Sequence, residues 1–173
     1  EGKLTYQATH DALTGLPNRT QLLERLAKAI TVARGNQQAC FAVLFLDLDR
    51  FKLVNDSAGH AVGDELLIEA ARRIVGSVRT GDVESRLGGD EFAVLLPDVD
   101  HQDVIMLVVN RILKLMNNCV EHNNIKVPFG VSIGIASYPQ DATNLDTLLK
   151  KADQAMYAAK RAGKGNAFFA KDN

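Results

Sequence analysis

Apolar residues at helical spacing, with suitable capping residues, predict where the helices of this chain lie. The spacing predicts four helices, at about 18–35, 63–78, 101–116 and 144–161. Asn18 and Asn144 are suited to cap the starts of the first and last helix. Gly35 and Gly163 are suited to end the same two helices.

Shorter apolar runs predict the strands. Residues 39–46 form a continuous run that is rich in Phe and Val, which is typical of a strand buried on both faces. Further strands are predicted at about 84–87, 92–96, 127–137 and 167–170. Gly88 and Gly89 stand between the second and third strands and indicate a hairpin turn.

The order of these elements predicts an α/β (α+β) fold with helices packed against a central sheet. Two β-α-β halves around the central hairpin would give a ferredoxin-like or polymerase-palm-like sheet, antiparallel in part. Residues 51–64 are rich in Gly, Asn and Asp, and we expect a long loop there that leads into the second helix.

Composition narrows the class of protein. The 173 residues fit one domain, which we expect at 10–173, with 1–9 as the end of a connecting helix. A net charge of −1 argues against a nucleic-acid groove, and no apolar run approaches the roughly 20 residues of a membrane span. We therefore expect a cytoplasmic domain without membrane contact, cut from a longer protein that could itself be tethered. Cys40 and Cys119 are expected to be reduced and packed.

Four carboxylates flank the predicted central strands. Asp47 and Asp49 follow the apolar run, and Asp90 and Glu91 follow the hairpin glycines. If the strands are neighbours, three or four carboxylates meet at one edge, where their repulsion favours a hard divalent cation such as Mg²⁺. Asp47 and Asp49 could instead cap the strand and face water.

The expected loop offers groups that can read a purine base. Asn55 supplies an amide and Asp64 a carboxylate, and a carboxylate can accept hydrogen bonds from the ring N–H and the amine of guanine. The alternative is a plain turn in which Asp64 is the N-cap of the next helix.

Together these segments resemble the successive signatures of the GGDEF family of diguanylate cyclases, from about His10 to Asn166. The matching segments are 11–19 (DALTGLPNR), 47–52 (DLDRFK), 55–56 (ND), 59–60 (GH), 63–64 (GD), 86–92 (RLGGDEF), 132–135 (SIGI) and 152–160 (ADQAMYAAK). The resemblance implies an enzyme that condenses two GTP into cyclic di-GMP and two pyrophosphates, with Mg²⁺ or Mn²⁺.

The resemblance also assigns the metal and catalytic residues. It implies that Asp47, Asp90 and the Leu48 carbonyl bind the metal ions, and that Asp90 or Glu91 helps to deprotonate the attacking ribose 3′-hydroxyl.

Substrate contacts follow in the same way. Asn55 and Asp64 match the positions that read guanine. The positions expected near the phosphates and the nucleotide loop are Phe51, Lys52, His60, Lys160 and Lys164. Many relatives carry arginine where Lys164 stands, and lysine keeps the charge without the two-pronged fork. Lys160 and Lys164 could also be a solvated basic helix end.

The resemblance further implies regulation by the product and by assembly. Arg79 and Asp82 form an RxxD motif at the spacing of the family's product-inhibition site, and Arg111 is a candidate second arginine. Each domain would hold one GTP, so catalysis requires a homodimer, and a preceding region would control it.

Other functions remain open at this point. The chain could be a catalytically silent receptor for GTP or cyclic di-GMP, a dimerisation domain beside another enzyme, or a cyclase acting on one ATP. The intact acidic signature favours catalysis.

Overall fold

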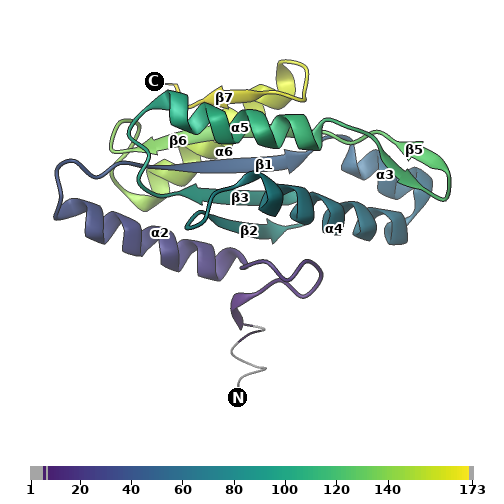
Figure 1. The fold of residues 1–173 in the computed structure, drawn as a ribbon, viewed down its shortest axis with the longest axis horizontal. Helices are drawn as coiled ribbons and strands as arrows, with labels where there is room; N and C mark the ends of the chain where they lie inside the picture. The colour runs from purple at the N-terminus through teal and green to yellow at the C-terminus, as the bar shows by residue number, and fades with distance from the viewer. Residues whose placement is uncertain (1–5, 7, 172–173) are drawn as a thin grey trace.

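The fold is a five-stranded sheet with helices on both faces (Figure 1). The computed structural model describes residues 6 and 8–171. Its regular elements are α2 (Arg19–Arg34), β1 (Phe41–Leu48), α3 (Phe51–Ala58), α4 (His60–Ser77), β2 (Val83–Gly88), β3 (Glu91–Leu96), α5 (Gln102–Met116), β4 (Val120–His122), β5 (Ile125–Val127), β6 (Val131–Tyr138), α6 (Leu145–Arg161) and β7 (Ala167–Phe169).

The strand order of the main sheet is β2-β3-β1-β6-β7. β1 lies at the centre, antiparallel to β3 and β6, and β2 pairs antiparallel with β3. β1, α4, β2, β3, α5 and β6 therefore form the β-α-β-β-α-β arrangement of a ferredoxin-like fold. β7 adds a parallel fifth strand beside β6. The predicted α/β class with a central, partly antiparallel sheet is confirmed.

Alternating residues of β1 divide the core into two layers. Ala42, Leu44, Leu46 and Leu48 belong to the cluster that α4 and α5 cover. Phe41, Val43 and Phe45 belong to the opposite cluster, which α2 and α6 cover. Because side chains alternate along a strand, Asp47 follows on the α2/α6 side.

The capping residues act as the sequence predicts. Asn18 Oδ1 accepts a hydrogen bond from the Gln21 amide at 3.1 Å, and Asn144 Oδ1 accepts one from the Thr147 amide at 2.9 Å. Gly35 is the C-cap of α2, and Gly163 follows the end of α6 with a φ of 127°. Each asparagine cap satisfies a backbone donor at the start of a helix that would otherwise lack a partner.

The prediction of a long loop over 51–64 is wrong. Most of it is helical, as α3 and the start of α4, with Gly59 between them at a φ of 93°. Asn, Asp and Ser are common in turns, but the burial of Val54 and the packing of Phe51 against the core stabilise α3. Asp64 consequently lies inside α4 and is not its N-cap.

The predicted strand at 127–137 is displaced. The strand of the main sheet in this region is β6, which begins at Val131. Residues 120–127 instead form the small β4–β5 hairpin. Asn123 and Asn124 make its two-residue turn with φ of 49° and 65°. Two adjacent asparagines suit such a turn, so the sequence did carry a signal for this hairpin.

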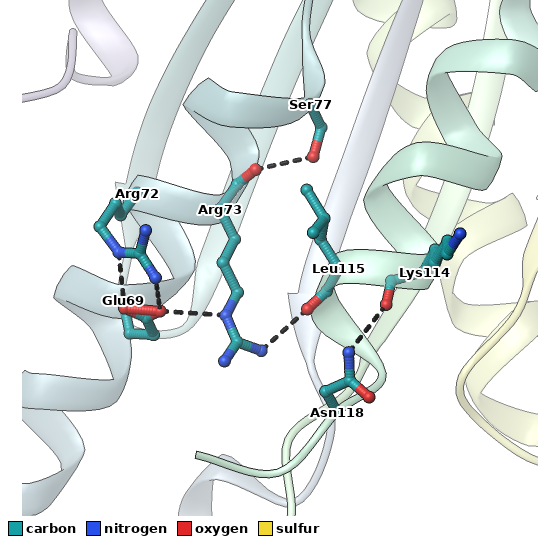
Figure 2. Close-up of polar contacts among 7 residues, drawn as sticks. All are labelled: Glu69, Arg72, Arg73, Ser77, Lys114, Leu115 and Asn118. Atoms are coloured by element: carbon teal, nitrogen blue, oxygen red, sulfur yellow. Dashed lines mark hydrogen bonds and ion pairs between the residues drawn. The ribbon is translucent and has the colours of Figure 1, made fainter. Parts of the chain in front are cut away.

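The side chain of Arg73 on α4 forms a hydrogen bond with the end of α5 (Figure 2). Its Nη1 donates to the Leu115 carbonyl at 2.8 Å, and its Nε donates to Glu69 at 3.0 Å. Glu69 also accepts from Arg72 at 2.8 Å, and the Arg73 guanidinium lies over the Phe129 ring. Hence α4, which carries Gly63 and Asp64, is held against its neighbour by polar contacts as well as by the core.

Three further sequence expectations concern smaller features. Most of the predicted connecting helix at 1–9 lies outside the described residues, although Tyr6, Ala8 and Thr9 are helical. Both cysteines are free, but Cys119 is exposed where we expected it to be packed. Within the part of the chain that the structure describes, no helix has the length and apolar character needed to cross a membrane.

Candidate active site

Three carboxylates gather at one end of the central strands. Asp47 is the next-to-last residue of β1 and stands directly opposite Glu91, the first residue of β3. Asp90 lies in the turn just before β3, where its carbonyl accepts a hydrogen bond from the Leu48 amide at 3.1 Å. The end of β1 and the start of β3 are therefore neighbours, as the sequence predicts. This pairing brings the acidic side chains to the α2/α6 side of the sheet.

The protein environment opposes ionisation of Asp47. Burial raises the pKa of Asp47 to about 8, with further contributions from a hydrogen bond to Asp90 and from the charges of Asp90 and Glu91. Lys160 acts in the opposite direction. Asp47 Oδ1 is buried without a hydrogen-bond partner. A buried carboxylate oxygen without a hydrogen-bond partner is stabilised when a cation binds to it.

Asp49 has a different role from Asp47 and Asp90. Its side chain is buried, and its Oδ1 accepts a hydrogen bond from Ser132 Oγ at 2.7 Å. Its Oδ2 accepts one from the Gly165 amide at 2.9 Å. Each oxygen of Asp49 thus has a donor within the protein, and the side chain links the loop after α6 to the end of β1.

Lys160 of α6 places a positive charge among these oxygens. Its Nζ lies 3.5 Å from Asp47 Oδ1, 3.6 Å from Asp49 Oδ1 and 3.5 Å from the Leu48 carbonyl oxygen. Two of the three predicted metal ligands, Asp47 and the Leu48 carbonyl, therefore already lie beside a cation. The alternative interpretation of Lys160, as part of a solvated helix end, does not fit these contacts.

The residues at this end of the sheet suit a divalent ion of the Mg²⁺ type. Two carboxylates, Asp47 and Asp90, and the Leu48 carbonyl offer hard oxygen donors, and Asp47 Oδ1 lacks a donor of its own. No group of three or more His, Cys, Asp or Glu side chains among residues 6 and 8–171 is arranged to hold a metal by itself. A metal here would therefore complete its ligands with backbone, water and phosphate oxygens.

Glu91 faces α6 and α2 across the same end of the sheet. Burial raises its pKa, and the charges of Asp153 and Asp90 raise it further, while Arg19 and Lys160 lower it. Asp47 and Glu91 both line a cleft of about 680 Å³ along α6. Asp153 and Arg19 are neighbours of Glu91 that the sequence analysis did not single out.

The predicted base-reading residues lie on two consecutive helices just beyond the end of β1 (Figure 1). Asn55 is on α3 and is half-buried, whereas Asp64 is on α4 and is exposed. Asn55 Oδ1 is buried without a hydrogen-bond partner and faces Gly63, the residue before Asp64. The helices thus bring the amide and the carboxylate to neighbouring positions, which a loop would not fix.

The other predicted substrate residues differ in how firmly they are placed. Phe51 is half-buried and packs against the core at the start of α3. Lys52, His60 and Lys164 are exposed, the first two in the opening turns of α3 and α4. Lys164 has a φ of 64° in the loop after α6. Their roles toward phosphates remain predictions.

The RxxD motif lies at the opposite end of the strands. Asp82 precedes Val83, which pairs with Leu95 near the end of β3, whereas Glu91 begins β3 beside Asp47. Arg79 donates from Nη2 to Asp82 Oδ1 at 3.1 Å and to the Pro97 carbonyl at 3.2 Å. The two motif residues therefore pair with each other. Arg111 is exposed on α5, and its part in a ligand site remains a prediction.

Arg86 links the hairpin turn to the N-terminal turn, a connection that the sequence analysis missed. Its Nη1 bonds Asp11 Oδ1 at 2.9 Å, and its Nη2 donates to the Gly89 carbonyl at 2.8 Å. Asp11 Oδ2 in turn accepts from the Thr14 amide and hydroxyl. Asp11 and Arg86 are 75 positions apart, so no local pattern could have paired them.

These observations define the class of the protein as an α/β domain with a ferredoxin-like sheet and an acidic site at the end of its central strands. Comparison with known proteins identifies the family. The sequence model described as "Diguanylate cyclase, GGDEF domain" matches residues 8–166. The chain belongs to the GGDEF diguanylate cyclase domain family.

Individual relatives agree with this assignment. Diguanylate cyclase TpbB of Pseudomonas aeruginosa is 44% identical over 164 residues, which are 94% of this chain and 38% of that protein. A structure of only the GGDEF domain of TpbB superposes with a TM-score of 0.89 at 42% identity, covering 94% of each chain. The GGDEF domain of DgcB from Caulobacter crescentus, solved in complex with c-di-GMP, gives 0.87 at 28% identity and covers 95% of this chain and 97% of that one. The chain spans well under half the length of TpbB.

Proposed function

We propose that this chain is a diguanylate cyclase domain that condenses two GTP into cyclic di-GMP and two pyrophosphates, using Mg²⁺ or Mn²⁺ in a two-fold homodimer. The observation that carries the proposal is the acidic pair Asp47 and Asp90 at the end of β1, with Asp47 Oδ1 buried and without a hydrogen-bond partner. Such a pair costs stability unless positive charge neutralises it, and Lys160 supplies only one positive charge beside it.

The chain supplies distinct groups for each part of the reaction. Asp47, Asp90 and the Leu48 carbonyl would hold the metal, which when bound neutralises the acids and polarises the phosphate under attack. Lys160, beside Asp47, adds positive charge for the phosphates. Asn55 and Asp64 would read the guanine edge. The metal ligands and Lys160 would therefore act on the phosphates, and Asn55 and Asp64 would act on the base.

A proton acceptor is needed for the ribose 3′-hydroxyl. Asp90 belongs to the acidic pair and Glu91 is adjacent to it, and burial with neighbouring negative charge raises the pKa of Glu91. A carboxylate with a raised pKa is a better general base at neutral pH than an ordinary one. One of these two residues would accept the proton as the oxygen attacks the partner's α-phosphate.

Product binding at the RxxD motif would regulate the domain. Arg79 can form a fork with phosphate or guanine, and Asp82 can accept from guanine N–H groups. The DgcB neighbour was solved with c-di-GMP, which is consistent with a product site in this family. A preceding region of the full-length protein would control how two domains meet.

Product analysis tests the proposal. The chain, fused to a dimerising coiled coil, is incubated with GTP and Mg²⁺, with ATP and Mg²⁺, or with GTP and EDTA, and the nucleotides are separated by chromatography. We expect cyclic di-GMP only from GTP with Mg²⁺. Tight binding of GTP or cyclic di-GMP without product would instead support the silent receptor, and a cyclic mononucleotide from ATP would support the third alternative.

A further inference from the structure

Gly63 leaves a space that another part of the site fills. It is buried in α4, and a Cβ placed on it would overlap Asn55 Oδ1. The same Cβ would lie 2.9 Å from Asn55 Cγ and 3.4 Å from Phe51 Cζ. Gly63 lies in the interior of α4, where the backbone is helical and any residue could adopt it. The glycine is thus required for space and not for backbone freedom.

The atom that occupies this space is itself unusual. Asn55 Oδ1 is buried and has no hydrogen-bond partner in the described chain. Leaving a buried acceptor unpaired costs about 1–3 kcal/mol, so packing against Gly63, and not a hydrogen bond within the described chain, sets the position of this amide oxygen. In α4, Gly63 is followed directly by Asp64, the second of the proposed base-reading residues.

We infer that Gly63 is a specificity-determining positioning residue, whose missing side chain seats the Asn55 amide for recognition of the guanine base. This inference rests on the proposed function. Gly63 makes no polar contact of its own and acts through Asn55. It leaves room for the Asn55 amide beside the point where α4 presents Asp64.

A methyl group at position 63 should affect recognition more than folding. The overlapping atom is the end of a flexible side chain, so the clash can be relieved by moving the Asn55 amide while both helices stay in place. The next contact, with Phe51 Cζ at 3.4 Å, is an ordinary van der Waals distance. Alanine in a helix interior is also favoured over glycine by roughly 0.5–1 kcal/mol. The fold should therefore survive while the amide loses its position.

Equilibrium binding of GTP and ATP in EDTA, by calorimetry on the 173-residue chain, measures recognition without turnover. We expect Gly63→Ala to weaken GTP binding about tenfold, the size of one lost hydrogen bond of roughly 1.4 kcal/mol, and to lower the preference for GTP over ATP by a similar factor. The melting temperature should not fall. Gly76→Ala is the matched control, because it lies on the same helix with nothing within 4 Å of its Cβ, and it should leave binding unchanged.

A double-mutant cycle shows whether Gly63 acts through Asn55. Asn55→Ala should weaken GTP binding by itself, and adding Gly63→Ala should then change it less than about twofold, because the overlapping atom is gone. If Asn55→Ala binds GTP normally, both the base-reading role and this inference are overturned. If Asn55→Ala binds weakly but Gly63→Ala binds normally, only this inference is overturned. An equal loss from Gly63→Ala in both backgrounds, or a large fall in its melting temperature, also overturns it.

Discussion

At the scale of single residues, three aspartates near the end of β1 differ in role because their surroundings differ. Asp49 is satisfied by Ser132 and by the Gly165 amide. Asp47 has a buried oxygen without a hydrogen-bond partner and a pKa raised to about 8, first by burial and then by Asp90. The sequence alone placed Asp47 and Asp49 together as candidate ligands, because the donor to Asp49 from Gly165 is 116 positions away.

Replacing Asp47 with Asn should raise the stability of the fold and abolish its activity. The pKa of Asp47 is about 3.9 in the unfolded chain and is raised in the folded protein. Ionisation of Asp47 therefore opposes folding at pH values above about 3.9. We expect Asp47→Asn to raise the melting temperature at pH 7 in EDTA, by about 2–4 °C for each kcal/mol, and to abolish turnover. Scanning calorimetry and product assay check both effects. A lower melting temperature in EDTA would contradict this account of the acidic pair.

Arg79 should control product inhibition and not the reaction itself, because the RxxD motif lies at the other end of β3 from Asp47. We expect Arg79→Ala to raise the inhibition constant of cyclic di-GMP at least about tenfold, as loss of a charged fork implies, with little change in initial rate. Inhibition curves with added cyclic di-GMP measure this. Arg72→Ala, an exposed arginine that pairs with Glu69, is the control, and inhibition unchanged in Arg79→Ala would remove the proposed site.

At the scale of elements, the active site depends on how closely α6 packs against β6. A Cβ on Gly134 would overlap backbone atoms of Ala152 and Met156, which cannot move without moving the helix. The same helix carries Lys160 to the acidic pair. The contrast with Gly63 is that the obstructing atoms here are backbone.

Gly134→Ala should therefore damage both stability and activity. We expect the free energy of unfolding to fall by about 1–3 kcal/mol, the usual cost of overpacking, and turnover to fall because Lys160 is displaced with α6. Urea denaturation and the product assay measure these effects. An unchanged free energy of unfolding in this variant would contradict the prediction, because it would show that α6 can move away from β6 at no cost in stability.

The turn at 11–17 is a second element that reaches the site, through Asp11 and Arg86. Burial raises the pKa of Asp11, but hydrogen bonds from Thr14 and the Arg86 guanidinium outweigh it, and the pKa is lowered overall. A lowered pKa gives stability that is present above the unfolded value near pH 4 and is lost as pH falls below it. We expect Asp11→Asn to cost about 1 kcal/mol at pH 7 and progressively less below pH 4, by urea denaturation. A constant difference across this range would contradict the assignment.

At the scale of the whole molecule, the sequence predicted what depends on local pattern and missed what depends on distant contacts. The caps Asn18 and Asn144 and the buried strand β1 were predicted, because periodicity and capping are local. Helix α3 was missed, because its turn-forming residues are outweighed by the burial of Val54. The Asp11–Arg86 contact was also missed, because only the folded sheet brings its partners together.

The proposed homodimer is also a property at this scale. If two domains must face each other, each holding one GTP, the specific activity of the unfused chain should rise with protein concentration, while that of the coiled-coil fusion should stay constant. Initial rates over a hundredfold range of protein concentration test this. Constant specific activity of the unfused chain, with no dimer detected by sedimentation, would contradict a requirement for two domains.

The most direct test of the central claim is the rate of cyclic di-GMP formation by the fused dimer carrying Asp90→Ala, compared with Asp103→Ala, an exposed aspartate at the start of α5. The account predicts no detectable product from Asp90→Ala, with unchanged far-UV circular dichroism, and full activity from Asp103→Ala. Normal product formation by a folded Asp90→Ala protein would show that the acidic end of β1 and β3 is not where the reaction takes place.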